Sequence, residues 1–131
     1  MDYLLDIHIL LWAVSEPGKL SGKHKKIIED PNNRIIVSHI SYMEIAIKVK
    51  IGKLPDFKTD IETLADHVEW KGMINLEIKI PHIQYYQNLR LSKEHRDPFD
   101  RFIISTAIVE NYTILTVDKK FQLYKKYLKI S

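Results

Sequence analysis

The sequence contains no cysteine among its 131 residues. Disulfide bonds, thiolate nucleophiles and cysteine-ligated zinc sites are therefore excluded, and the absence fits a reducing compartment. Glycine and proline are also scarce, with four and five residues, and no repeat, low-complexity tract or linker-like run divides the chain. The length and the 45% hydrophobic content predict a single domain over residues 1–131.

Long apolar runs are missing as well. The longest, residues 9–14, is far shorter than a bilayer requires, and Asp2, Asp6 and His8 interrupt the region where a secretory signal would be apolar. We therefore expect a cytoplasmic protein with no membrane contact. The charge is nearly balanced, with 20 Lys and Arg against 17 Asp and Glu and a pI near 9.0. This balance permits a polyanionic partner without indicating one.

Short apolar segments alternate with segments of helical periodicity along the chain. The predicted strands cover residues 1–6, 34–39, 73–78, 112–117 and 127–130. The predicted helices cover residues 8–14, 22–30, 41–53, 58–72, 81–89 and 100–110, with a helical turn from residue 118. Strands separated by helices are typical of right-handed crossovers, so the pattern predicts an α/β fold with a parallel sheet covered on both faces.

Four acidic residues follow the predicted strands. Asp6 ends the first strand, and Asp118 ends the strand before the last. Glu44 is expected in the first turn of the helix after the second strand, and Asp100 lies at the start of the apolar helix. In an open parallel sheet, ligands bind at the carboxyl ends of the strands. The topology therefore predicts that all four carboxylates lie at one edge.

Most of these acids also have a purely structural interpretation. The spacing of Ser41 and Glu44 matches a capping box. Asp97, followed by proline, is typical of a helix N-cap, which places Asp100 in the first turn, where the helix dipole favours a negative charge. Asp118 fits an N-cap in its own right.

Asp6 fits a structural role least well, because it lies between two apolar segments, where an unpaired charge is costly. Three further carboxylates nearby would raise one another's pKa values unless a cation held them ionised. Without cysteine, and with carboxylates rather than histidine pairs at ligand spacing, the pattern favours Mg²⁺ or Mn²⁺ over zinc. Such a site suits the hydrolysis of phosphodiester bonds.

Histidines and basic residues accompany the acids. A lone histidine in an apolar stretch is usually a satisfied core residue, which we expect for His8, whereas His95 is a candidate ligand or acid–base group. Arg96 and Arg101 flank the charged stretch and are candidates for phosphate contacts or for structural ion pairs, between which the sequence does not decide.

Four segments in this order resemble the PIN-domain ribonucleases, and more narrowly the VapC-type toxins of bacterial toxin–antitoxin pairs. They read LLDIHILLW, SYMEIAIK, HRDPFDRFIISTA and LTVDKKF, and the resemblance extends from residue 2 to about residue 130. It implies that Asp6, Glu44, Asp100 and Asp118 bind Mg²⁺ or Mn²⁺ and cleave RNA. It also implies that Thr116 supports the last acid. Asp97 is expected to support the site by starting the helix that aims Asp100.

The resemblance further implies a three-layer α/β/α fold with a central parallel sheet of about five strands. It implies a homodimer and a small cognate antitoxin whose segment lies across the acidic groove. Related sequences usually read Asp-Thr-His in the first segment, whereas this chain has Ile7 in place of the threonine. That difference leaves open a degenerate PIN module that binds RNA or a partner without cleaving. In such a fold the basic runs at residues 23–26 and 119–126 are either solvated faces or RNA contacts.

A receiver-type phosphoacceptor domain is a third alternative, since it also gathers acids around magnesium. The segment VSHIS, however, has no aspartate where the phosphate acceptor would lie.

Overall fold

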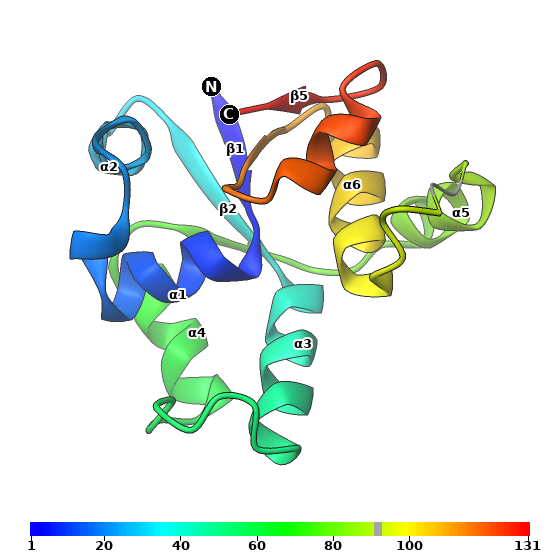
Figure 1. Cartoon of the computed structure of the whole chain (residues 1–131). Helices are drawn as coiled ribbons and strands as arrows, with labels where there is room; N and C mark the ends of the chain where they lie inside the picture. Colours follow the sequence, from blue (N-terminus) through cyan, green and yellow to red (C-terminus); the bar gives the residue numbers. More distant parts are fainter. Residues whose placement is uncertain (91–92) are drawn as a thin grey trace.

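The computed structural model describes residues 1–90 and 93–131 and places them in a five-stranded parallel sheet with helices on both faces (Figure 1). The strands are β1 (Asp2–Leu5), β2 (Arg34–Ser38), β3 (Ile74–Leu76), β4 (Thr113–Leu115) and β5 (Lys129–Ile130). The helices are α1 (Ile7–Ser15), η1 (Pro17–Lys19), α2 (Gly22–Glu29), α3 (His39–Lys50), α4 (Ile61–Trp70), α5 (Ile80–Asn88), α6 (Pro98–Glu110) and η2 (Lys119–Tyr124). The expected three-layer α/β/α architecture is confirmed.

The sheet has the strand order β3-β2-β1-β4-β5, so the first strand lies at its centre. Tyr3 pairs with Ile35 of β2 on one side and with Thr113 of β4 on the other. Every pairing is parallel. A receiver domain has the order 2-1-3-4-5, so the topology rules out the phosphoacceptor interpretation. The strand order reverses between β1 and β4, which is where an open α/β sheet places its ligand.

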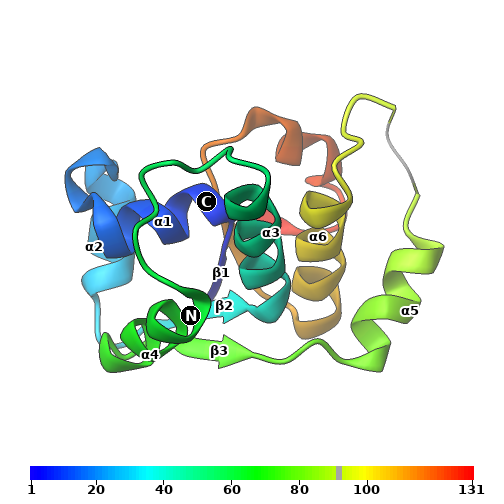
Figure 2. The same cartoon turned by 90° about the horizontal axis from the view of Figure 1, so that it is seen from below.

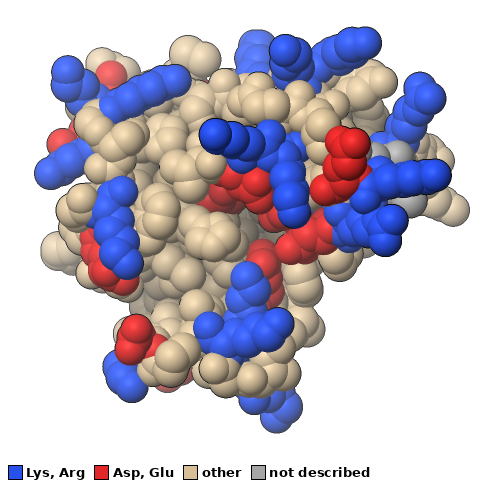
Figure 3. Space-filling view, in the orientation of Figure 1, with Lys and Arg blue, Asp and Glu red and all other residues tan. Residues whose placement is uncertain are grey.

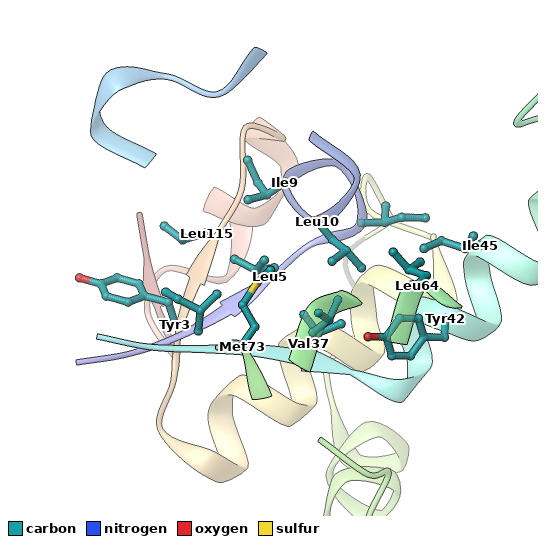
Figure 4. Close-up of a cluster of buried hydrophobic side chains, with 13 residues drawn as sticks. Tyr3, Leu5, Ile9, Leu10, Val37, Tyr42, Ile45, Leu64, Met73 and Leu115 are labelled. Atoms are coloured by element: carbon teal, nitrogen blue, oxygen red, sulfur yellow. The ribbon is translucent and has the colours of Figure 1, made fainter. Parts of the chain in front are cut away.

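Successive side chains of β1 and β2 point to opposite faces and fill two separate cores. Tyr3, Leu5 and Val37 join the core under α1, α3 and α4, where Leu10, Tyr42, Ile45 and Leu64 converge on the sheet (Figure 4). Leu4 and Ile36 belong to the second core, beneath α6 and η2. A strand buried on both faces needs a continuous apolar run, which explains why the sequence of β1 shows no alternation.

Two helices bring the site region together. Figure 2 shows α3 and α6 side by side, with α5 beyond α6. Helix α3 follows β2 and α6 precedes β4, so each lies next to a strand close to the centre of the sheet. Within the residues that the structure describes, no helix is long and apolar enough to cross a membrane.

The start of α3 differs from the sequence-based expectation. Ser38 is the N-cap, and its hydroxyl accepts a hydrogen bond from the Ile40 amide at 3.1 Å. Ser41 therefore lies inside the helix, and the predicted capping box between Ser41 and Glu44 is wrong. A helix that begins at His39 places Glu44 in its second turn, where the capping role is not open to it.

The burial of β1 on both faces of the sheet leads to a quantitative prediction. Leu4 is fully buried in the central strand, so we expect Leu4→Ala to lower the free energy of unfolding by about 3 kcal/mol, because it removes buried surface and leaves a cavity. Leu123→Ala is the control, since Leu123 is 44% exposed, and its effect should stay below about 0.5 kcal/mol. Urea denaturation measures both; equal effects would contradict the core assignment.

Candidate active site

The first acid is held by the turn from the central strand into α1. Asp6 follows β1 directly and is the N-cap of α1, where its Oδ1 accepts a hydrogen bond from the Ile9 amide at 2.9 Å. Its Oδ2 accepts a hydrogen bond from the Thr116 hydroxyl. The side chain is only 2% exposed. Asp6 therefore caps a helix and also presents a fixed, buried carboxylate at the end of the sheet.

Thr116 joins the first and the last acid. Its hydroxyl donates to Asp6 and accepts a hydrogen bond from the Asp118 amide at 3.0 Å. Asp118 in turn caps η2, where its Oδ1 accepts from the Lys120 amide at 2.9 Å. A single hydroxyl thus fixes the carboxylate of Asp6 and the backbone of Asp118, which belong to opposite ends of the sequence.

The second acid comes from the side of α3 that faces the site. Glu44 is 4% exposed, and its Oε2 lies 3.0 Å from Nζ of Lys48, one helical turn further on. The pair is spaced i,i+4, which places both side chains on one face of α3. Lys48 neutralises a carboxylate that would otherwise be a costly buried charge.

The third acid is aimed by the start of α6. Asp97 is the N-cap and accepts hydrogen bonds from the Phe99 amide at 2.8 Å and the Asp100 amide at 3.4 Å. Asp100 lies in the first turn, and its Oδ2 is 2.9 Å from Nε2 of the buried His95. The N-cap assignment of Asp97 is confirmed, and the cap together with His95 fixes the direction of Asp100.

These elements enclose one cavity of about 150 Å³ at the carboxyl edge of the sheet. Its acidic lining residues are Asp6, Glu44, Asp97, Asp100 and Asp118. Its other charged or titratable lining residues are His8, Lys48, His95, Arg96 and Lys120. Figure 3 shows the resulting pattern, with acidic side chains in a hollow and Lys and Arg side chains on its rim. All four of the acids expected at one edge therefore face the same cavity.

Crowding and burial make ionisation costly here. Burial raises the pKa of the Asp6 carboxyl, and its hydrogen bonds from Ile9 and Thr116 only partly oppose that rise. Burial raises the pKa of Asp100 to about 6, helped by the nearby charges of Asp97 and Glu44 and opposed by the hydrogen bond to His95. A cation in the cavity would remove most of this cost.

The donor atoms of the cavity fit a divalent ion. His95, Asp100 and Asp118 each present one ligand atom, and these three atoms all lie within 4.8 Å of one another. Asp6 and Glu44 add carboxylate oxygens to the wall of the same cavity. Carboxylates with an imidazole suit a hard or borderline divalent ion.

Some residues lie differently from the sequence-based expectation. His8 is exposed and lines the cavity, so its interpretation as a core residue is wrong. Arg101 is not among the residues that line the cavity, and its Nε donates to the His95 carbonyl at 2.8 Å. Ile7 is buried at the cavity wall. Lys48 lines the cavity but was not among the residues predicted from the sequence. Its i,i+4 spacing from Glu44 was the signal that could have identified it.

Comparison with known proteins gives a consistent result. The sequence model of the family described as PIN domain matches residues 3–127. The chain is 28% identical over 129 residues to a protein named Ribonuclease VapC22 from Mycobacterium tuberculosis. That similarity covers 93% of this chain and 91% of the relative.

Solved structures share the fold. A structure of VapBC2 from Rickettsia felis, bound to a DNA fragment from its promoter, aligns with a TM-score of 0.65 and 20% identity, over 100% of this chain and 98% of that one. VapBC-5 from Mycobacterium tuberculosis, described as a member of a family of toxin–antitoxin systems, aligns with a TM-score of 0.62 and 15% identity, over 99% and 95% of the two chains.

The raised pKa of Asp100 leads to a stability prediction. The pKa of the Asp100 carboxyl is near 3.8 in the unfolded chain and about 6 in the folded one. In the pH range between these values the native state binds more protons than the unfolded state, so the free energy of unfolding falls as the pH rises. With EDTA at about pH 7.5, we expect Asp100→Asn to be more stable than wild type by about 1–2 kcal/mol, a value reduced for partial solvent screening.

The stability advantage of Asp100→Asn over wild type should shrink below about pH 6 and vanish near pH 4, where residue 100 is neutral in both folded proteins. Urea denaturation at several pH values measures it. The exposed Asp66→Asn on α4 serves as the control and should stay within about 0.5 kcal/mol of wild type throughout. A variant less stable than wild type at neutral pH would show that the carboxylate is not under electrostatic stress.

Proposed function

Because the chain belongs to the PIN domain family, we propose that it is a metal-dependent endoribonuclease that hydrolyses RNA phosphodiester bonds. The observation that carries this proposal is the single cavity into which Asp6, Glu44, Asp100 and Asp118 all project, at the switch point of a parallel sheet. The similarity to a protein named as a ribonuclease supports RNA as the substrate. The same acids would be the metal ligands.

The proposed cofactor is Mg²⁺ or Mn²⁺, which carboxylate-rich sites prefer. When bound, such an ion polarises the phosphate and activates the attacking water. The chain's own part is to hold the ligands in fixed positions. Thr116 orients Asp6 by donating to its Oδ2, and His95 orients Asp100 through the 2.9 Å contact. Ligands held in this way need little reorganisation when the ion arrives.

Basic residues at the rim have a separate role in the proposal. Arg96 and Lys120 line the cavity beside the acids, and we assign them to phosphate oxygens of the RNA. Arg101 has a structural role instead, because it is not among the lining residues of the cavity and its Nε donates to the carbonyl of His95, the residue that contacts Asp100. The Nε of Arg96 also donates to a carbonyl, that of Lys93 at 2.9 Å, but Arg96 lines the cavity. The two arginines that flank the charged stretch are therefore assigned different roles.

The biological setting is also proposed. The relative from Mycobacterium tuberculosis carries a VapC name, and the similar folds come from VapBC complexes, described for VapBC-5 as toxin–antitoxin systems. We infer that this chain is the toxin of such a pair, acting in the cytoplasm as a homodimer and restrained by a cognate antitoxin protein. Recovery of ribonuclease activity only after removal of a copurifying partner would support this inference.

The nuclease is tested with a mixed single-stranded RNA and purified protein. We expect cleavage with Mn²⁺ or Mg²⁺, none with EDTA, and a loss of at least about 100-fold in rate for Asp100→Asn, since the ligand set would be incomplete. Asp66→Asn is the matched control and should cleave like wild type. Cleavage by Asp100→Asn at the wild-type rate would exclude the cavity as the site, and failure to bind Mn²⁺ in calorimetry would leave only a non-cleaving PIN module.

The role of Thr116 can be separated from general packing. Thr116→Val keeps the side-chain shape but removes the hydroxyl, so we expect Mn²⁺ affinity or the cleavage rate to fall about 10- to 100-fold. Thr116→Ser retains the donor and should stay within about threefold of wild type. Calorimetric Mn²⁺ titration measures the first effect without relying on activity. Equal behaviour of the two variants would mean that the hydrogen bond to Asp6 is unimportant.

A further inference from the structure

A groove leaves the acidic cavity between the second half of α3 and the start of α6. It has a volume of about 450 Å³. Glu44, Lys48, Arg96 and Asp97 line both the cavity and the groove, so the two are continuous. Figure 2 shows the helices that form its walls side by side. The groove therefore opens directly onto the proposed position of the cleaved phosphate.

The far part of the groove is apolar. Ile47 of α3 and its C-cap Ile51 line it together with Pro98 and Phe99 of α6. Ile51 is 59% exposed and Ile47 is 36% exposed, although each has a large hydrophobic side chain. Phe99 is partly exposed as well. Contiguous exposed apolar side chains next to a catalytic cavity indicate a surface that contacts a ligand.

The charges along the groove select among ligands. Lys48, Lys53 and Arg96 line it together with the carboxylates of Glu44 and Asp97. Both acids are already engaged, since Glu44 contacts Lys48 at 3.0 Å and Asp97 accepts the amide hydrogens at the start of α6. The same contact engages Lys48, so Lys53 and Arg96 are the cations that the groove offers to a ligand, beside an apolar wall that includes an aromatic ring.

That combination fits single-stranded RNA. Proteins bind single strands with cations along the backbone and aromatic or apolar side chains against the unstacked bases. A second copy of the chain fits less well, because a two-fold contact would bring Lys53 and Arg96 close to the same cations of the other copy. An RNA duplex keeps its bases stacked inside the helix and gains nothing from the apolar wall.

We propose that this groove binds the single-stranded RNA segment next to the cleaved bond, with phosphates at Lys53 and Arg96 and a base against Phe99 and Ile51. The proposal rests on the proposed ribonuclease function. It adds a direction to the substrate, since the strand runs from the acidic cavity along α3 towards Lys53. It also predicts that the enzyme contacts nucleotides on one side of the cleaved bond in particular.

Binding can be measured without cleavage in the Asp100→Asn background. The probe is a fluorescein-labelled single-stranded RNA of mixed sequence, about 12 nucleotides long, and the readout is anisotropy at several NaCl concentrations. Adding Lys53→Gln should lower the affinity and reduce the slope of log K against log[NaCl] by about 0.7, the contribution of one phosphate contact to a single strand. Lys129→Gln on β5, outside both the groove and the cavity, should change neither quantity.

The apolar wall has a different signature. Phe99→Ala should weaken binding about fivefold or more while leaving the salt slope unchanged, because stacking involves no released counterion. Ile51→Ser should act in the same direction, and its exposed position avoids a folding defect. A duplex of the same sequence should bind more weakly than the single strand and should be insensitive to Phe99→Ala.

Two results would overturn the proposal. One is an unchanged affinity and salt slope in Lys53→Gln together with unchanged affinity in both apolar variants. The other is a loss of oligomer mass in light scattering for Ile51→Ser or Phe99→Ala, which would make the groove an interface between copies. Cleavage by wild type is scored separately. If wild type cleaves RNA but the groove variants bind RNA as tightly as their parent, the groove proposal alone is rejected. If the groove variants bind RNA more weakly but wild type cleaves no RNA, the ribonuclease proposal alone is rejected.

Discussion

The main physical constraint on this structure is the electrostatic cost of holding several buried carboxylates at one edge of a parallel sheet. Asp6 is almost completely buried, and the pKa of Asp100 is raised to about 6 by burial and by its acidic neighbours. Such crowding weakens the fold unless a cation compensates for it. The molecule meets this constraint locally with Lys48 at Glu44 and His95 at Asp100. A divalent ion in the cavity would offset the remaining repulsion between the carboxylates.

Helix starts supply the geometry that this constraint requires. Asp6 and Asp118 are N-caps of α1 and η2, and Asp100 lies in the first turn of α6 behind the N-cap Asp97. In each case the amides at the start of the helix favour a negative charge there. Structural and functional interpretations of these acids are therefore compatible. A residue that caps a helix is already fixed in direction, and a fixed carboxylate is what a metal ligand has to be.

Much of this arrangement was predictable from local patterns. Apolar runs such as that before Asp6 indicated the strands, and the rule for carboxyl ends of parallel strands indicated the edge at which the acids meet. Positions that depend on tertiary packing were not predictable. The α3 N-cap is Ser38 rather than Ser41, because the helix begins as soon as β2 ends and the length of β2 is set by its pairing with β1 and β3. His8 faces the cavity although its neighbours in the sequence are apolar, since the direction of α1 decides which side of the helix is covered.

The pairing of the central strand has a consequence for how the protein is made. Strand β1, at the start of the chain, lies between β2 and β4, and Asp6 is tied to Thr116 across the sheet. A ribosome that has synthesised the chain as far as Asp100 has therefore produced three of the four acids but neither β4 nor Asp118 to complete the cavity. Contacts so distant in sequence form late and all together. The cavity is therefore complete only after β4 and Asp118 have been synthesised, and its four acids come together in one late step of folding.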